Sequence, residues 1–454
     1  MFDADTKAAI IDLAVSGKLS SDFCATDSAT EIVSSLPPVS SKREKLLSQS
    51  FGYGKQFSIP EHWRWVPLGE ISSYGDTPEK AYYSDVTSDT WILDLEDIKA
   101  GGEIIEKTRA EKKKFIGDKT VFKKGQILYS KLRPYLKKIL VADEDGVSTP
   151  ELIAFDTYGG ILPQYIVYCL LSSYVDRAID KRSYGVKMPR IDAGFMVNLP
   201  IPLPPISEQR FIVDRVEKVF SQISIIDTLQ SQYQENLAAL KSKIIDAGIQ
   251  GKLTEQLPED GTAEELYQQI QQEKLALEKA GKIKKAKPLP PISDEEKPFD
   301  IPENWKWVRI GGIANAIYAG GDKPKDFSKV KDNTHLIPVV GNGVENEGIL
   351  GYTGKPTAKA YTVTVAGRGT IGFSVFRKYE YCPVVRLIVI EQNANIDPRY
   401  IQYVLQALPE SGVGSSIPQL TVPMLTPKVI PLPPLAEQKR IVAKLEELLP
   451  LCEG

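Results

Sequence analysis

The chain has 454 residues, of which 42% are hydrophobic and 25% charged, and its formal net charge is −3. This composition is typical of a globular protein of about three domains, and the net charge excludes a protein that is basic over its whole surface. Four widely spaced cysteines and only two histidines argue against a zinc site or a disulfide framework. No apolar run reaches the roughly 18 residues of a membrane span and no signal-peptide pattern is present, so we expect a cytoplasmic protein without a membrane partner.

The N-terminal half predicts a short helix, a linker and a globular unit. Residues 1–24 predict the helix, and residues 25–56 predict a surface linker because they are rich in serine, proline and charge. Residues 57–205 predict the first globular unit, which mixes β-rich segments such as Trp91–Leu95 with helical ones such as Tyr165–Leu171. This mixture indicates a mixed α/β (α+β) fold.

Residues 206–254 predict a long central helix with an apolar seam. The steps along the seam are three, four and once seven residues, where polar Gln230 fills the gap. Its members are Ile212, Val216, Val219, Ile223, Ile226, Tyr233, Leu237, Leu240 and Ile244. Such a seam needs a partner helix, and residues 435–454 predict one with a matching stripe, so we expect a pair of long antiparallel helices.

The C-terminal half repeats the pattern of the first. Residues 255–298 predict a polar helical segment and a second linker, and residues 299–434 predict a second, strand-rich globular unit. The helix at 435–454 stops halfway, since Gly454 matches Ile225 of the central helix. Either the two ends of the chain meet in space, so that the N-terminal helix completes the C-terminal one, or the chain is shortened at its C-terminus.

Three segments of the chain occur twice, at separations of 242, 229 and 234 residues. FSIPEHWRWVPLGEI at 57–71 returns as FDIPENWKWVRIGGI at 299–313, IPLPPISEQRFIVDRVEK at 201–218 as IPLPPLAEQKRIVAKLEE at 430–447, and KAAIIDLAVSGKLS at 7–20 as KSKIIDAGIQGKLT at 241–254. The duplication predicts two globular units related by a pseudo-twofold axis. A ligand that is itself nearly twofold suits this symmetry, and duplex DNA is the obvious candidate.

Two basic stretches lie at corresponding places of the repeat. Residues 110–140 carry ten Lys and Arg against two acids, and residues 350–390 carry six against one. One such run is usually a solvated face, but two matching runs favour polyanion binding. The candidate DNA-binding residues are Lys131, Arg133, Lys137, Lys138, Lys187 and Arg190 in the first unit and Arg368, Thr370 and Gln419 in the second.

Two of these candidates occupy matching positions. Arg190 aligns with Gln419, and because Arg suits guanine and Gln suits adenine, the two could read different bases. The alternative, that both only bond the backbone of a loop, is equally open.

The duplicated segments PLPPISEQRFIVDRVEKVF and PLPPLAEQKRIVAKLEELLPLC, each after a globular unit, resemble the specificity subunit of a type I restriction-modification system. IPEHWRWVPLGEI and IPENWKWVRIGGI resemble the openings of its target-recognition domains. The resemblance implies that each unit reads one half of a bipartite, asymmetric site on double-stranded DNA. It implies two methyltransferase subunits bound to the helical regions, restriction subunits in the same complex, and S-adenosylmethionine, ATP and magnesium only in those partners. The candidate partner-binding residues are Glu208, Gln209, Arg210, Asp214, Glu437 and Gln438.

The chain shows no recognisable catalytic motif. It lacks a GxxxxGK[ST] loop and an Asn/Asp-Pro-Pro-aromatic motif. Asp94, Glu96, Asp97 and Lys99 in WILDLEDIK resemble a metal-nuclease cluster, but the second repeat has no matching lysine. We therefore predict a non-catalytic DNA-recognition subunit without catalytic or metal-binding residues. A self-contained nuclease or methyltransferase, and a coiled-coil scaffold without DNA function, are the alternatives.

Overall fold

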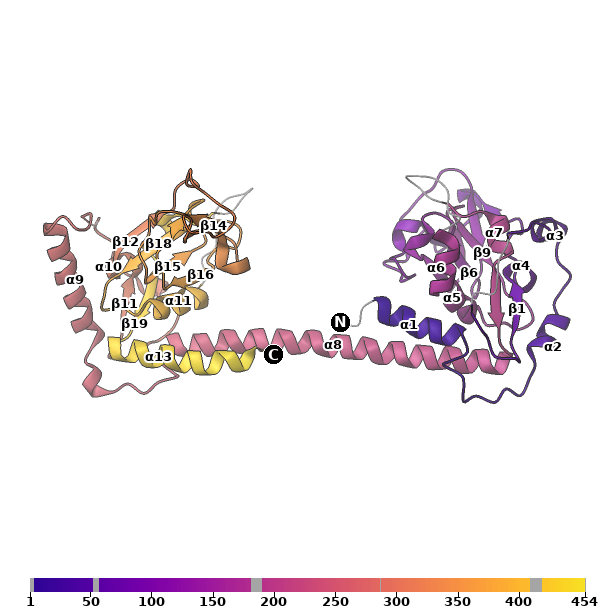
Figure 1. Cartoon of the computed structure of the whole chain (residues 1–454), viewed down its shortest axis with the longest axis horizontal. Helices are drawn as coiled ribbons and strands as arrows, with labels where there is room; N and C mark the ends of the chain where they lie inside the picture. The colour runs from indigo at the N-terminus through magenta and orange to yellow at the C-terminus, as the bar shows by residue number, and fades with distance from the viewer. Residues whose placement is uncertain (1–3, 52–56, 181–189, 286, 409–418, 454) are drawn as a thin grey trace. The chain divides into compact units, whose positions relative to one another are not determined.

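A computed structural model of the chain describes residues 4–51, 57–180, 190–285, 287–408 and 419–453. The chain divides into two compact units, Met1–Gln230 and Ser231–Gly454, hereafter unit 1 and unit 2 (Figure 1). Each unit combines helices with three small sheets, which confirms the expected mixed fold. Within the described ranges no helix is long and apolar enough to cross a membrane.

Unit 1 has a two-stranded, a five-stranded and a three-stranded sheet. β1 (Arg64–Pro67) pairs antiparallel with β10 (Pro200–Leu203), so the two ends of the globular part lie side by side. The five-stranded order is β2-β5-β8-β3-β4 and the three-stranded order is β7-β6-β9. Their bounds are β2 Lys80–Ala81, β3 Trp91–Leu93, β4 Thr108–Arg109, β5 Lys119–Phe122, β6 Ile127–Ser130, β7 Ile139–Val141, β8 Gly146–Ser148 and β9 Leu152–Phe155.

Helices pack around these sheets, and α5 (Pro163–Leu171) buries six of its nine residues. Proline at its first position suits the helix start, and its buried tyrosines and aliphatic residues join the main core. The segment expected as a linker contains two short helices, α2 and α3, capped by the side chains of Ser28 and Ser40. The other bounds are α1 Ala4–Val15, α2 Ala29–Ser34, α3 Ser41–Leu47, α4 Leu68–Ile71, α6 Ser173–Asp180 and α7 Ala193–Val197.

Unit 2 repeats much of this order. β11 (Lys306–Arg309) pairs antiparallel with β19 (Val429–Leu432), as β1 does with β10. The other sheets have the orders β12-β18-β15-β16 and β14-β13-β17. Their bounds are β12 Ala314–Ala319, β13 Ile337–Val340, β14 Ile349–Thr353, β15 Thr362–Val365, β16 Ser374–Arg377, β17 Cys382–Pro383 and β18 Ile388–Gln392; the helices are α9 Ala263–Lys279, α10 Ile310–Ile313, α11 Pro398–Ala407, α12 Val422–Leu425 and α13 Leu435–Leu448.

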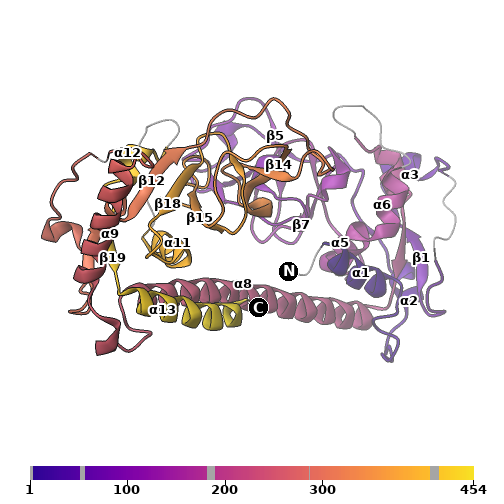
Figure 2. The same ribbon diagram turned by 60° about the vertical axis from the view of Figure 1, so that its left-hand side comes forward.

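α8 (Ile206–Ile249) is a continuous helix of 44 residues. α1 lies along its N-terminal part and α13 along its C-terminal part (Figures 1 and 2), where Leu445 packs against Gly248. The seam is therefore buried at its ends, for example at Ile212 and Val216. Its middle is not: Ile226, Tyr233 and Leu240 are 47%, 55% and 48% exposed, and Ile225 and Leu229 are exposed too. Two different helices thus cover the two ends of the seam, α1 in unit 1 and α13 in unit 2.

One buried carboxylate joins the three duplicated segments of unit 1. Glu208, at the start of α8, is 1% exposed. It accepts hydrogen bonds from the Ser20 hydroxyl at 2.6 Å and the Trp63 indole N–H at 3.0 Å, and it contacts the His62 ring at 2.7 Å. A buried carboxylate is stable only when such donors surround it, so this residue fixes the N-terminal segment and the start of the globular part on α8.

Unit 2 has the same arrangement around Glu437, which is fully buried. The Trp305 indole donates at 2.8 Å, the Gln256 amide at 2.9 Å and the Thr254 hydroxyl at 3.2 Å. The sequence segments that recur are thus the ones that meet at this carboxylate.

The glutamine that follows each glutamate fastens another helix. The Gln209 amide oxygen accepts from the Leu162 N–H at 3.0 Å, at the start of α5, and its NH₂ donates to the Pro204 carbonyl at 2.9 Å. Gln438 bonds the Asp397 N–H and the Pro433 carbonyl in the same way, each at 2.9 Å. Each glutamine therefore satisfies one of the free N–H groups that a helix N-terminus leaves.

We expect Glu437→Ala to destabilise unit 2 by roughly 2–4 kcal/mol, because three buried donors lose their acceptor. Hydrogen exchange measures this, with the amides of unit 1 as an internal reference. Glu447→Ala is the control, since the Glu447 side chain is 64% exposed and pairs with Lys444 alone among the described residues. Equal protection in the two variants would contradict the assigned role of Glu437.

Candidate nucleic-acid interface

The structure removes four of the six residues expected to bind partner subunits from the surface. Glu208, Gln209, Glu437 and Gln438 are all buried and hydrogen-bonded inside their own unit. The first turns of α8 and α13 pack against the globular part of their own unit. That part therefore buries residues of these turns that do not belong to the apolar seam. Arg210, which directly follows Gln209, and Asp214, one turn further on, are exposed.

Three of the six expected DNA-binding residues of unit 1, Lys131, Arg133 and Arg190, lie where β6 ends. We define the first tip as residues 131–133, Glu151 and residues 190–191. The Lys131 carbonyl accepts from the Ile191 N–H at 3.2 Å, and Leu132 forms a β-bridge with Arg190. The Arg190 guanidinium donates to the Glu151 carboxylate at 3.0 Å, and the Lys131 ammonium lies 3.7 Å from the same group. Residues about 60 positions apart in sequence thus form one surface.

Two lysines of the same stretch point elsewhere. Lys137 donates to the Leu171 carbonyl at 2.9 Å and pairs with Asp176 at 2.6 Å, and Lys138 donates to the Leu95 carbonyl at 2.6 Å. Both are partly buried and satisfied within unit 1, so the expectation that they contact DNA is not supported. Lys187 lies outside the described residues.

All three candidates of unit 2 gather where β15 ends. We define the second tip as residues 366–370, 385–386 and 419–420. The Arg368 guanidinium donates to the Gln419 amide oxygen at 3.1 Å, and the Thr370 hydroxyl donates to the Asn342 carbonyl at 2.9 Å. The Nε–H of Arg368 is buried and has no acceptor among the described residues. An unpaired buried donor in a native structure needs an explanation, and an acceptor atom of a bound ligand would supply one.

The two tips are built on the same backbone frame. In the first, Lys131 N–H donates to the Glu151 carbonyl at 3.1 Å, and the chain before α7 pairs with Lys131 and Leu132. In the second, Gly367 packs against the Arg386 carbonyl, and the Leu420 N–H, before α12, donates to the Gly367 carbonyl at 2.9 Å. The duplication therefore extends to the sites that we expect to contact DNA.

Two further tip residues escaped sequence reasoning. Glu151 and Arg386 occupy matching places on this frame, so one tip carries an acid where the other carries a base. Arg386 is exposed and has a left-handed backbone with φ of 60°, next to Val385 with φ of 54°; Arg133 in the first tip has φ of 49°. Left-handed conformations of non-glycine residues cost energy and cluster at functional sites, but sequence does not reveal them.

The charged residues of WILDLEDIK, at 91–99, make contacts within unit 1. Burial would raise the pKa of Asp94, but hydrogen bonds from Lys119 and Lys113 outweigh this and hold it below its ordinary value. The Asp97 carboxylate accepts from the Asp94 N–H at 2.8 Å, and Lys99 pairs with Glu103 at 2.9 Å. In the ranges that the structure describes, no three His, Cys, Asp or Glu side chains are grouped to hold a metal ion.

Comparison with known proteins decides the family. The model of the type I restriction modification DNA specificity domain matches residues 60–233 and 302–452, one copy in each unit. The chain belongs to the type I restriction-modification DNA specificity family. It is a specificity subunit, the non-catalytic component that recognises DNA. This assignment decides against both alternatives, a self-contained enzyme and a scaffold without DNA function.

Relatives and solved structures agree with the assignment. The specificity subunit of the Escherichia coli type I restriction enzyme EcoAI is 27% identical, with 98% of this chain and 88% of that protein covered. That of EcoEI, also from Escherichia coli, is 30% identical, with 68% and 62% covered. A structure described for complex assembly and conformational transition of a type I system has a TM-score of 0.61 at 21% identity, covering 87% of this chain and 92% of that one. The HsdS subunit from Thermoanaerobacter tengcongensis has a TM-score of 0.52 at 19% identity, covering 88% and 92%. These two structures share the fold.

We expect Glu151→Gln to strengthen non-specific DNA binding, because the carboxylate that neutralises Lys131 and Arg190 is lost. The slope of log K against log salt should become steeper by about one. Fluorescence anisotropy with duplex DNA over a salt series measures it. Glu144→Gln is the matched control, since it makes the same change in net charge at a carboxylate that pairs with Lys107 and Arg109. Equal slopes for the two variants would place the first tip away from DNA.

Proposed function

We propose that each unit of this specificity subunit contacts one half of a bipartite, asymmetric DNA site through its tip. The observation that supports this most directly is that six expected residues, three from each unit, gather on a matching frame. The site needs no catalytic group, because recognition requires only donors and acceptors held in position.

Within each tip the residues divide into two roles. Lys131 and Arg133 project from the exposed turn after β6 and suit phosphate oxygens, which set register and affinity without reading sequence. Arg190 and Arg368 each lie beside a side chain that orients the guanidinium, Glu151 and Gln419 respectively. An oriented guanidinium can make the bidentate contact with guanine O6 and N7 that discriminates bases in the major groove.

The different neighbours predict different bases. A carboxylate beside Arg190 accepts hydrogen bonds and suits the N4 amino group of cytosine, whereas an amide beside Arg368 suits the N6 and N7 of adenine. Arg386 adds another donor to the second tip. Because the side chains on the two matching frames differ, the two halves of the recognised site should differ in sequence.

Partner subunits are proposed to bind along α8. Its exposed residues include Arg210, Asp214 and the apolar Ile226, Tyr233 and Leu240. A large exposed apolar stripe is typical of a protein interface. The partners proposed to bind there are two methyltransferase subunits, with restriction subunits in the same complex. S-adenosylmethionine, ATP and magnesium would be bound by those partners. The complex would act in the cytoplasm, where DNA is accessible.

Arg190→Ala should relax specificity in one half of the recognised site, and Arg368→Ala in the other half alone. Loss of a bidentate contact costs about 1–3 kcal/mol of discrimination at one base pair. Sequencing of methylated sites, in cells that carry the complete system, measures both halves at once. Lys112→Ala, at an exposed lysine outside the first tip, is the control. A single variant that relaxed both halves would refute independent reading.

Ile226→Glu with Tyr233→Glu should abolish co-purification of the methyltransferase subunit, because charge is placed in the exposed apolar stripe. Both positions face solvent in the isolated chain, so the fold should persist. Gln232→Glu with Gln234→Glu makes the same charge change on the same helix at exposed polar positions. If both pairs bind the partner equally, α8 is not the docking surface.

A further inference from the structure

Unit 2 contains an edge strand, β12, that has no equivalent among the described strands of unit 1. β12 is the terminal strand of its sheet, and among the described strands only β18 pairs with it. Its six residues present about 20 Å of free edge at roughly 3.3 Å per residue. Such an edge offers alternating N–H and C=O groups without partners.

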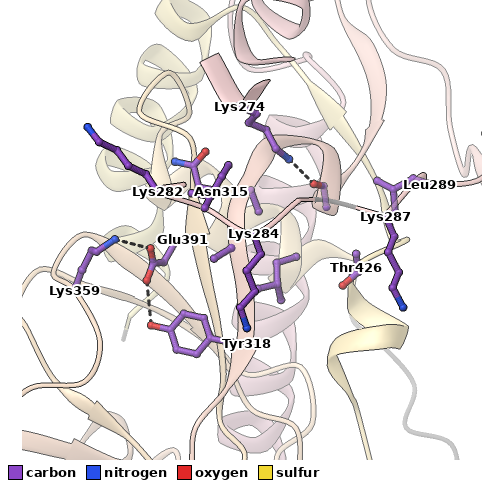
Figure 3. Close-up of a pocket in the computed structure, with 15 residues that line it drawn as sticks. Lys274, Lys282, Lys284, Lys287, Leu289, Asn315, Tyr318, Lys359, Glu391 and Thr426 are labelled. Atoms are coloured by element: carbon purple, nitrogen blue, oxygen red, sulfur yellow. Dashed lines mark hydrogen bonds and ion pairs between the residues drawn. The ribbon is translucent and has the colours of Figure 1, made fainter. Parts of the chain in front are cut away.

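A cavity of about 610 Å³ runs beside this edge (Figure 3). Residues Ala314–Tyr318 of β12 form one side, and the segment that follows α9 forms the other. Ile283 and Leu289 of that segment, with Ile317 and Tyr318 of the strand, make the lining partly apolar. The Tyr318 hydroxyl donates to the Glu391 carboxylate at 3.2 Å, and burial and that carboxylate raise the pKa of Tyr318.

Five lysines line the cavity, and three of them are available. The Lys274 ammonium donates to the Gly311 and Gly312 carbonyls at 2.8 and 3.0 Å, and burial lowers its pKa. Lys359 pairs with Glu391 at 3.0 Å. The available three, all exposed and without an acidic partner in the described part of the chain, are Lys282, Lys284 and Lys287.

We propose that this cavity binds an extended acidic peptide segment of a partner protein, which pairs with the free edge of β12 as an added strand. Its main chain would match the alternating donors and acceptors of β12, as in other cases of strand addition. Its carboxylates would face Lys282, Lys284 and Lys287. A small phosphate ligand fits the site less well, because the edge also presents carbonyl oxygens, which repel an anion.

The lysines select the class of peptide. Lysine beside an edge strand normally keeps other strands away. The carboxylates of an acidic segment are instead attracted to these lysines. The basic lining therefore favours binding of acidic strands over neutral or basic ones.

The corresponding part of unit 1 is built differently, because the described residues there form no strand equivalent to β12. After α4 the chain makes only an isolated bridge, Ser72 with Thr157, where unit 2 has β12. Arg43 of α3 donates to the Gly69 and Ser72 carbonyls there, as Lys274 does to those of α10. Within the described ranges the edge of β12 with its lysines is therefore a feature of unit 2, and a partner bound to it would distinguish the two halves of a duplicated subunit.

The test uses the full chain and a fluorescein-labelled peptide, acetyl-Glu-Val-Glu-Val-Glu-Val-amide, in anisotropy titrations. We expect saturable binding that Lys282→Glu, Lys284→Glu and Lys287→Glu together weaken at least tenfold. The control for position is Lys285→Glu, an exposed lysine of the same segment that does not line the cavity, and affinity should stay within twofold. Because DNA contacts are proposed elsewhere, the triple variant should bind DNA as the native chain does.

Two further peptides separate strand pairing from general attraction of anions. They carry N-methyl groups on the odd or on the even amides, with charge unchanged, and one of the two should lose at least tenfold in affinity. Equal binding of both would overturn the proposal in favour of a polyanion site, as would displacement of the peptide by an equal concentration of inorganic tripolyphosphate. Absence of saturable binding, or equal loss with Lys285→Glu, would also overturn it.

Discussion

Each unit depends on one buried carboxylate. Burying a charged group costs several kcal/mol unless hydrogen-bond donors surround it. Glu208 and Glu437 obtain theirs from segments that lie far away in sequence, so their burial forces those segments together. The globular part of each unit therefore packs against the first turn of a helix, α8 in unit 1 and α13 in unit 2. The strand pairs β1–β10 and β11–β19 bring the two ends of each globular part together.

The packing around this carboxylate explains further details of the repeat. Gly17 has φ of 76°, and a Cβ there would lie 2.6 Å from Pro60; Gly251 has φ of 72°, and a Cβ would lie 2.5 Å from Pro302. Only glycine combines this conformation with so close an approach. The glycine of each GKL segment and the proline of each IPE segment are therefore parts of one contact, which also positions the indole that donates to the carboxylate.

Sequence periodicity and repetition predicted the mixed fold, the two similar units and the long helix α8, because these follow from local pattern and from comparing the chain with itself. The burial of Glu208 and Gln209 could not be predicted in this way. A heptad seam defines only the face that meets another helix, and the first turn of α8 meets the globular part instead.

The same limit applies to the tips. The sequence predicts that Lys131 and Arg190 belong to one DNA-binding site but does not predict a contact that they share. Glu151, whose carboxylate lies beside both, is far from Arg190 in sequence and could not be recognised as their shared partner. Lys137 and Lys138 look equivalent to Lys131 in a count of charges. Their partners, Asp176 and the carbonyls of Leu171 and Leu95, come from tertiary structure. Charge density along a chain therefore locates a basic surface but does not say which cations are free.

A duplicated frame also restricts where the two units can differ. Each carboxylate must keep its surrounding donors, because a change there leaves a buried charge or a buried donor unpaired. The tips lie outside that constraint, which permits Glu151 in one and Arg386 in the other. The edge of β12 is outside it as well, since the carbonyls at the end of α4 and α10 need only a cation, supplied by Arg43 in one unit and Lys274 in the other. At the tips and at this edge the units thus differ on surfaces that a ligand can reach, while the internal contacts keep both surfaces in position.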